Sequence, residues 1–258
     1  METILKSLGI TKKNIAQLYI LHNSCDVDVY SMELDNGNKY AIKIRKDGAS
    51  VIHEASIQNQ IAEYINTVRL VLLVGPYTEV LQMNYFMLDH GSFERLLETK
   101  QSDTLIQQMA DAVIDIERQL CKNNIAHKDL HWGNISFEYA YKSLERGYDN
   151  TTYTIQLKGA MYTVQASVLD FDTSSFTHCS TPLDLAQLIR TLWWVERGAW
   201  VLDKSNIVRM TKILLRKFPI AFPETKQTAR RLKTIITRSS KAITELDKYY
   251  IKLLRQTI

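Results

Sequence analysis

The stretch NNIAHKDLHWGNISF, residues 123–137, decides the fold, because it sets an Asp and an Asn five positions apart between two apolar segments. Asp129 and Asn134 are that pair, and His127 precedes Asp129 by two positions. Such a stretch is either a catalytic loop or a polar turn, in which an Asp side chain bonds its own backbone. The segments before and after it decide between these alternatives.

Residues 16–44 are predicted to form strands of a small antiparallel sheet. The segments "DVYSMEL" and "KYAIKI" are rich in β-branched and aromatic residues, and Asn36-Gly37 lies between them, which is a strong hairpin signal. Because side chains alternate along a strand, Lys43 shares a face with the small Ala41. Lys43 therefore points to a side where a small neighbour leaves room.

One helix and two further strands are predicted next. In "ASVIHEASIQNQIAEYINT" (49–67), Ser50 can cap a helix on which Ile57, Ile61 and Ile65 recur every four residues. The segments "RLVLLV" (69–74) and "EVLQMNYFML" (79–88) have strand composition. The order predicts a small sheet with one helix.

After residue 88 the sequence becomes mainly helical. Ser102 is the predicted cap of a long helix, and Thr181 the predicted cap of a later one. Alternation returns over 151–170, with a turn at Lys158-Gly159, and ends in "VLDFD". The expected fold class is therefore α+β. We expect a single two-lobed domain, 1–258, with an antiparallel N-lobe over about 1–88 and a helical C-lobe over about 89–258.

Four fragments follow one another along the chain, and their order is informative. They are "YAIK" at the end of a strand, Glu54 on the next helix, "HKDLHWGN" and "VLDFD". They resemble the protein-kinase signatures, which run from a strand Lys and a helix Glu to an H-R-D-L-x-x-x-N loop and a D-F-G triplet. The resemblance extends over nearly the whole chain. It implies a two-lobed kinase fold that transfers a phosphoryl group from ATP with Mg²⁺.

The chemistry of phosphoryl transfer then suggests a role for each residue, since catalysis depends on positioning and on neutralising charge. Lys43 would hold the α- and β-phosphates, and Glu54 would hold Lys43 in place. Asp129 would accept or orient the proton of the attacking hydroxyl. Asn134 and Asp170 would bind Mg²⁺ through oxygen atoms.

Two further residues have a structural interpretation. His127 is expected to pack under the loop and orient it without transferring protons. Asp184, in "STPLDLAQLI", falls in a first helical turn, where an acid is favourable to the helix dipole. In kinase folds an Asp at this place also ties down the backbone of the catalytic loop, and both explanations stay open.

The glycine-rich loop of kinases is absent, because its three glycine positions fall on His22, Ser24 and Val27. Glycines allow a backbone to approach phosphates closely. Without them we expect either weak ATP affinity or a different mode of binding. Ser24 in this loop and Leu88, in the hinge at 87–90, are candidates for contacting the nucleotide.

Within the kinases, "HKDLHWGN" is most similar to the haspin-type loop HRDLHWGN. Haspin relatives insert a hairpin before the metal-binding Asp, where this chain has "YTIQLKGAMYTVQASVLDFD", and they also replace the D-F-G triplet. Here Asp172 stands in place of the glycine, which disfavours a backbone flip to positive φ.

The resemblance to haspin-type kinases implies a serine/threonine protein kinase, with chromatin proteins such as histones as one substrate class. The compact size suggests a minimal kinase of the kind that large DNA viruses encode.

Two other functions remain open. Only 14 positions separate Asp170 from Asp184, and with "DFD" and "DLA" this resembles small-molecule kinases of the aminoglycoside and choline type, whose loop reads HGDLHxGN. Lys128 and the inserted hairpin favour the haspin-like alternative. The lost glycines instead favour a pseudokinase that acts as a binding module. The short segment also predicts activity without activation-loop phosphorylation.

Composition describes an ordinary globular chain of 258 residues with 45% hydrophobic and 23% charged residues. The three cysteines form no CxxC pair and are expected to be reduced, and no signal peptide or membrane span is expected. We therefore expect a soluble intracellular protein that is cytoplasmic or nuclear. If the protein is viral, this compartment is that of the host cell.

The C-terminal segment is strongly basic, since residues 204–258 hold 14 Lys and Arg against 3 Asp and Glu. These cations are either solvated helix faces or a surface for an acidic partner.

Overall fold

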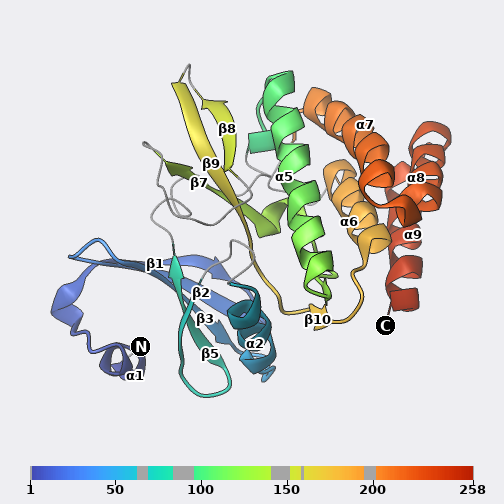
Figure 1. Cartoon of the computed structure of the whole chain (residues 1–258). Coiled ribbons are helices and arrows are strands. Elements are labelled where there is room, and N and C mark those ends of the chain that lie inside the picture. Colours follow the sequence, from blue (N-terminus) through green and yellow to red (C-terminus); the bar gives the residue numbers. More distant parts are fainter. Residues whose placement is uncertain are drawn as a thin grey trace.

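The computed structural model describes residues 2–62, 69–83, 96–140, 152–157, 160–194 and 202–257. The chain forms a sheet-rich N-terminal part and a larger, mainly helical part (Figure 1). Each part has its own apolar core, with the smaller core around Met32, Ile42 and Val80. The predicted α+β class and its division into a small sheet and a helical part are confirmed.

The N-terminal sheet has five strands in the order β1-β2-β3-β5-β4, and every neighbouring pair is antiparallel. Its strands are β1 (Ile15–Asn23), β2 (Val27–Leu34), β3 (Lys39–Arg45), β4 (Arg69–Leu73) and β5 (Thr78–Met83), and the short helix α1 (Glu2–Ser7) precedes them. The predicted Asn36-Gly37 turn joins β2 to β3. Gly37 has a φ of 81°, which a glycine adopts without strain.

Helix α2 (Ile52–Ile61) packs on this sheet, beside β4. The predicted cap at Ser50 is one residue early: Val51 is the N-cap residue, although the Ser50 hydroxyl accepts the Ile52 N–H at 3.1 Å. The predicted Ile57 and Ile61 are buried, and Glu54 lies with them on the inner face. Ile65 and the end of the predicted helix lie outside the described residues.

Five helices form most of the C-terminal part that the structure describes. They are α5 (Asp103–Lys122), α6 (Thr181–Trp193), α7 (Lys204–Ala221), α8 (Lys226–Arg238) and α9 (Ala242–Thr257). In Figure 1, α6 lies between α5 and the pair α8 and α9. Ser102 caps α5 as predicted, since its side chain accepts the Leu105 N–H. None of the described helices is long and apolar enough to cross a membrane.

The predicted cap of α6 is wrong by one residue. Ser180 is the N-cap, and Thr181 is the first helical residue. Neither hydroxyl accepts a capping N–H of the helix, because each has another partner. Thr181 Oγ1 donates to Glu224, and Ser180 Oγ donates to the buried carboxylate of Asp184 at 2.9 Å.

A second sheet follows the stretch 123–137 and contains the predicted hairpin. Its strands β7 (Ile135–Ala140), β9 (Ala160–Val168) and β8 (Thr152–Leu157) are antiparallel neighbours in that order. The predicted turn at Lys158-Gly159 lies outside the described residues. Strand β9 leads directly into Asp170. A short ladder of β6 (Ile125–Ala126) with β10 (Ser175–Phe176) then joins the segments on either side of the site.

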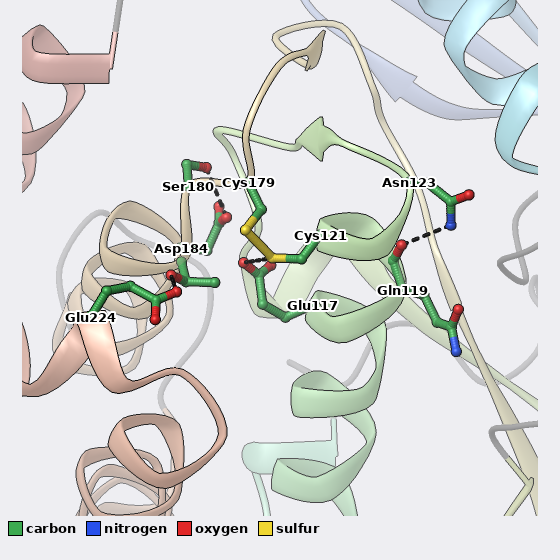
Figure 2. The surroundings of a disulfide bond; sticks show 9 residues. Glu117, Gln119, Cys121, Asn123, Cys179, Ser180, Asp184 and Glu224 are labelled. Atoms are coloured by element: carbon green, nitrogen blue, oxygen red, sulfur yellow. Dashed lines mark hydrogen bonds between the residues drawn. A yellow bond between two sulfur atoms is a disulfide. The ribbon is translucent and has the colours of Figure 1, made fainter.

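The prediction that all three cysteines are reduced thiols is wrong for two of them. Cys121, near the end of α5, forms a disulfide with Cys179, just before α6, while Cys25 is free and exposed (Figure 2). The two cysteines are 58 positions apart in the sequence, and only the packing of α5 beside α6 brings their Cα atoms to 4.6 Å. The bond ties the segment after Asp170 to helix α5.

We expect reduction of this disulfide, or Cys121→Ser, to lower the free energy of unfolding by about 2–4 kcal/mol, because the bond closes a long loop in the unfolded chain. The measurement is urea unfolding followed by fluorescence, with and without reductant. Cys25→Ser is the matched control and should leave the midpoint unchanged. A wild-type midpoint that does not respond to reductant would contradict the expectation.

Candidate active site

Lys43 lies at the centre of the candidate site and is held by carboxylates from two other segments. Its Nζ atom is 2.6 Å from Glu54 Oε2 and 3.1 Å from Asp170 Oδ1. The structure therefore brings three of the predicted residues together from β3, α2 and the end of β9. It also agrees with the choice of Glu54, which is 2% exposed, as the partner of Lys43.

Burial and neighbouring charges shift the pKa values of Lys43, Glu54 and Asp170. Burial alone would lower the pKa of Lys43, but the Glu54 and Asp170 carboxylates raise it above its ordinary value. Burial raises the pKa of Glu54 to about 7, although Lys43 opposes that shift. Burial likewise acts to raise the pKa of Asp170, yet the Lys43 charge and hydrogen bond hold it below its ordinary value. At neutral pH the site thus presents a charged lysine and a charged Asp170.

Glu54 also orders the backbone next to Asp170. Its second oxygen, Oε1, accepts the Phe171 N–H at 3.2 Å. One buried carboxylate thus holds both the lysine and the segment that carries the predicted metal ligand. This double use explains why an acid is buried on the inner face of α2.

His127 joins the loop 127–134 to the segment 169–174, as its predicted structural role requires. Its Nε2 atom lies 3.0 Å from the Leu169 carbonyl, and its ring packs on Phe171 with centroids 4.9 Å apart. Burial lowers the pKa of His127, so the ring is neutral and Nε2 carries the proton that Leu169 accepts. The His127 carbonyl in turn accepts the Thr173 and Ser174 hydroxyls.

Asp129 is the half-exposed carboxylate of this loop, with 36% of its side chain accessible. Gln187 Nε2 on α6 donates to its Oδ1 atom at 2.7 Å, while its Oδ2 atom lies 3.7 Å from His131 Nε2. Sequence reasoning missed Gln187. A polar residue on the inner face of α6, three positions after Asp184, was the signal that could have found it.

The loop contains an unusual backbone conformation. Lys128 has a φ of 66° and Asp170 a φ of 59°, both in the left-handed region that non-glycine residues rarely adopt. Lys128 stands where small-molecule kinases have Gly. In the DFD triplet the left-handed residue is Asp170, not Asp172, so replacing the third glycine does not strain this conformation.

Asp172 has a partner that the sequence did not reveal. Arg45, two residues after Lys43 on β3, forms an ion pair with Asp172, and Lys43 Nζ lies 3.9 Å from the same carboxylate. Positions 43 and 45 share one face of the strand, because side chains alternate. The third residue of the triplet therefore anchors the segment to the N-terminal sheet.

The described residues give no support for the two predicted nucleotide contacts, Ser24 and Leu88. Ser24 lies in the turn between β1 and β2, where its hydroxyl oxygen accepts the Asp26 and Val27 N–H groups at 3.2 and 3.1 Å. The side chain thus builds the turn that glycines would otherwise form. Leu88 and the hinge at 87–90 lie outside the described residues. The nucleotide-binding roles of Ser24 and Leu88 stay predictions.

The predicted metal ligands suit a hard cation such as Mg²⁺. Asn134 Nδ2 donates to the Asp129 carbonyl at 3.1 Å, which fixes the amide and makes its oxygen the atom that can bind a metal. The Leu169 N–H donates to the Asn134 carbonyl at 2.8 Å, so the two ligand-bearing segments are joined at the backbone. Two oxygen ligands plus substrate phosphates are the usual set for Mg²⁺.

Two buried acids lie behind the loop, next to the disulfide (Figure 2). Glu117 and Asp184 are 0% and 1% exposed. Burial raises the pKa of Glu117 well above its ordinary value, and the Asp184 charge raises it further. Burial also raises the pKa of Asp184 to about 7, against the Ser180 hydrogen bond and the Leu130 backbone, which favour its charged form. Asp184 thus fits both explanations of its role, because it lies in the first turn of α6 and also next to the Leu130 backbone in the loop 127–134.

The basic C-terminal segment presents an exposed cationic helix. In α8, Lys226, Arg230, Arg231 and Lys233 are exposed, and none of them forms an ion pair with another described residue. Such a face is either solvated or bound by a polyanion. An acidic partner for this segment stays a prediction.

Comparison with solved structures identifies the fold. The chain is similar to "WaaP in complex with acyl carrier protein", at a TM-score of 0.49 and 14% identity over 92% of this chain and 89% of that one. It is also similar to "Crystal structure of BubR1 kinase domain", at a TM-score of 0.51 and 13% identity over 92% and 84%. The second likeness shows that the chain has a protein-kinase-like fold, as predicted. Comparisons with protein-family models and with curated protein sequences find no match.

The buried acids predict a pH-dependent stability. Asp184 and Glu117 have folded pKa values above their unfolded ones, so the folded state binds more protons and the free energy of unfolding falls as pH rises from about 4 to 7. We expect Asp184 to account for a loss on the order of 1–2 kcal/mol between pH 5.5 and 7.5. Glu117→Gln should lower the dependence of the unfolding free energy on pH, because one of the two buried acids is then absent. Urea unfolding at three pH values measures both. An equal pH slope in wild type and variant would refute this account.

Proposed function

We propose that the chain is an ATP-dependent serine/threonine protein kinase, which transfers the γ-phosphoryl group of Mg-ATP to a protein hydroxyl. The observation that carries the proposal is the joint placement of Lys43, Glu54 and Asp170, with Asp129 on the adjoining loop. A cation for phosphates, a metal-binding carboxylate and a base are the groups that phosphoryl transfer requires.

Each residue then has one task in the reaction. Lys43 binds the nucleotide phosphates and needs no reorientation, because Glu54 already holds it. Asp129 Oδ2 takes the proton of the substrate hydroxyl while the hydroxyl oxygen bonds to the γ-phosphorus and the bond to the β-phosphate oxygen breaks, leaving ADP. Asn134 and Asp170 would hold Mg²⁺, which neutralises phosphate charge when bound.

The choice of a protein substrate rests on the resemblance to haspin-type kinases. The β8–β9 hairpin before Asp170 and Lys128 in the loop both support it, and we extend it to chromatin proteins as a substrate class and to a minimal, viral kinase. Lys128 in a left-handed conformation weakens the contrast with small-molecule kinases, because their glycine would fit the same backbone. A small alcohol is therefore the alternative substrate to test.

A pseudokinase is the second candidate, and the turn around Ser24 favours it. The hydroxyl of Ser24 is engaged by its own turn, and the glycines that let a backbone approach phosphates are missing. The intact Lys43–Glu54 pair argues against it. Packed apolar residues can often replace a whole buried ion pair without loss of stability, so a chain without nucleotide chemistry has little need to keep the pair.

We expect Asp129→Asn to lower the rate of phosphate transfer by about 10²–10⁴-fold, because the base is lost while the shape of the side chain is kept. The assay offers labelled Mg-ATP with the protein itself, histones, a generic acidic protein and a panel of small alcohols. Binding of Mg-ATP, measured as a rise in melting temperature, should persist in the variant. Label on an alcohol alone would favour a small-molecule kinase, and no transfer by the wild type would favour the pseudokinase.

Activity should not depend on phosphorylation of the segment between Asp170 and Asp184. Thr173 and Ser174 already donate to the His127 carbonyl, and the disulfide anchors the segment at Cys179. Treatment with a phosphatase, followed by its removal, is expected to change the transfer rate by less than about twofold, well below the loss of a catalytic group. A protein that becomes inactive after this treatment would show that a phosphate is required.

A further inference from the structure

The C-terminal helix α9 contacts the catalytic loop directly, through one tyrosine. Tyr250 OH donates to the Lys128 carbonyl at 3.1 Å, across 122 positions of sequence. Helix α9 also packs along α6, the helix that carries Gln187 (Figure 1). Two contacts with the loop, one to its backbone and one to the Asp129 carboxylate, thus come from the same pair of helices.

We propose that α9 positions the catalytic base, through Tyr250 on the loop backbone and through an Arg190–Gln187 pair on the Asp129 carboxylate. The inference rests on the proposed function in one respect, since it calls Asp129 the base. It assigns Gln187, Arg190 and Tyr250 as positioning residues that do not touch the substrate.

The Tyr250 contact acts where the loop backbone is least favourable. Lys128 holds a left-handed φ of 66°, which is sterically unfavourable for a non-glycine residue. A donor on its carbonyl helps to keep that peptide in place, directly before Asp129. Burial raises the pKa of Tyr250 to about 12, and the Asp129 charge adds to this, so the hydroxyl keeps its proton at neutral pH.

Arg190 determines which way the Gln187 amide faces. Its Nη1 atom lies 3.1 Å from Gln187 Oε1, and because a guanidinium only donates, the amide oxygen must face Arg190. The amide nitrogen is then left for Asp129 Oδ1, at 2.7 Å. The orientation of a glutamine amide is usually ambiguous, but here a charged neighbour specifies it.

Arg190 is in turn held by α9. Its Nε atom pairs with Asp247, and its guanidinium carbon lies over the rings of Trp194 and Tyr250, 4.6 and 5.0 Å from their centroids. These cation–π contacts and the ion pair restrict the long side chain to one position. Tyr250 thus serves both contacts with the loop, one through its hydroxyl and one through its ring.

The consequence for the base is an assignment of its two oxygens. Gln187, which is 4% exposed, occupies Oδ1, and Oδ2 remains for a substrate hydroxyl. Free rotation of the carboxylate would otherwise present either oxygen to the substrate, or neither. A fixed carboxylate is the kind of preorganisation that raises the rate of the chemical step without raising substrate affinity.

The test compares Tyr250→Phe and Gln187→Met with two matched controls. Tyr249→Phe removes the neighbouring hydroxyl on α9, which faces Thr228. Thr191→Val removes a hydroxyl that donates to the Gln187 and Leu188 carbonyls and leaves the Gln187 side chain in place. We expect kcat for phosphate transfer to fall about 10–100-fold in both test variants, within the loss expected from small misplacement of a catalytic group. KM for ATP and the Mg-ATP melting shift should stay unchanged. Arg190→Lys should retain more activity than Arg190→Met, because it can still donate to Gln187.

A second readout does not depend on activity. Amide hydrogen exchange in residues 127–131 should be faster in Tyr250→Phe and Gln187→Met than in wild type and in the two controls. Unchanged exchange and unchanged kcat would overturn the proposal. A wild type that transfers no phosphate would refute the proposed function, and the exchange rates would still decide whether α9 positions the loop.

Discussion

The buried pair of Lys43 and Glu54 is the interaction on which the site depends. Lys43 Nζ and Glu54 Oε2 lie 2.6 Å apart and are largely removed from water, and losing either side chain leaves the other buried without its partner, at a cost of about 3–5 kcal/mol. Asp170 and the Phe171 N–H complete the cluster. The pair therefore fixes three segments relative to one another: strand β3, helix α2 and the chain that leaves β9.

The loop 127–134 is held from the opposite side by hydrogen bonds that its backbone and its Trp132 side chain form. The carbonyls of Lys128 and His127 accept side-chain hydroxyls, and Trp132 Nε1 donates to the Leu188 carbonyl on α6 at 2.9 Å. These bonds come from α6, α9 and the short segment after Asp170. They give the loop its order in the absence of a phosphorylated residue, since neutral groups supply the contacts.

The underside of the loop carries a different constraint. Glu117 and Asp184 are buried side by side next to the Cys121–Cys179 bond, where burial favours their protonated forms. Protonation of these two acids stabilises the junction of α5 and α6 at low pH, and the disulfide stabilises the same junction covalently. The predicted reduced thiols were wrong here, because the pairing depends on the approach of two helices that sequence spacing does not show.

The sequence by itself determined the elements and the order of the site. Strand alternation placed Lys43 beside Ala41, helical periodicity placed Glu54 on the inner face of α2, and the Asp129–Asn134 spacing identified the loop, because each of these patterns is local. Tertiary structure alone decided the partners: Gln187 for Asp129, Arg45 for Asp172, Tyr250 for Lys128 and Cys179 for Cys121. Each of these pairs, Arg45 and Asp172 included, joins residues about 58 to 127 positions apart. Only the packing of helices and strands against a common core brings such residues within reach, since no local periodicity connects them.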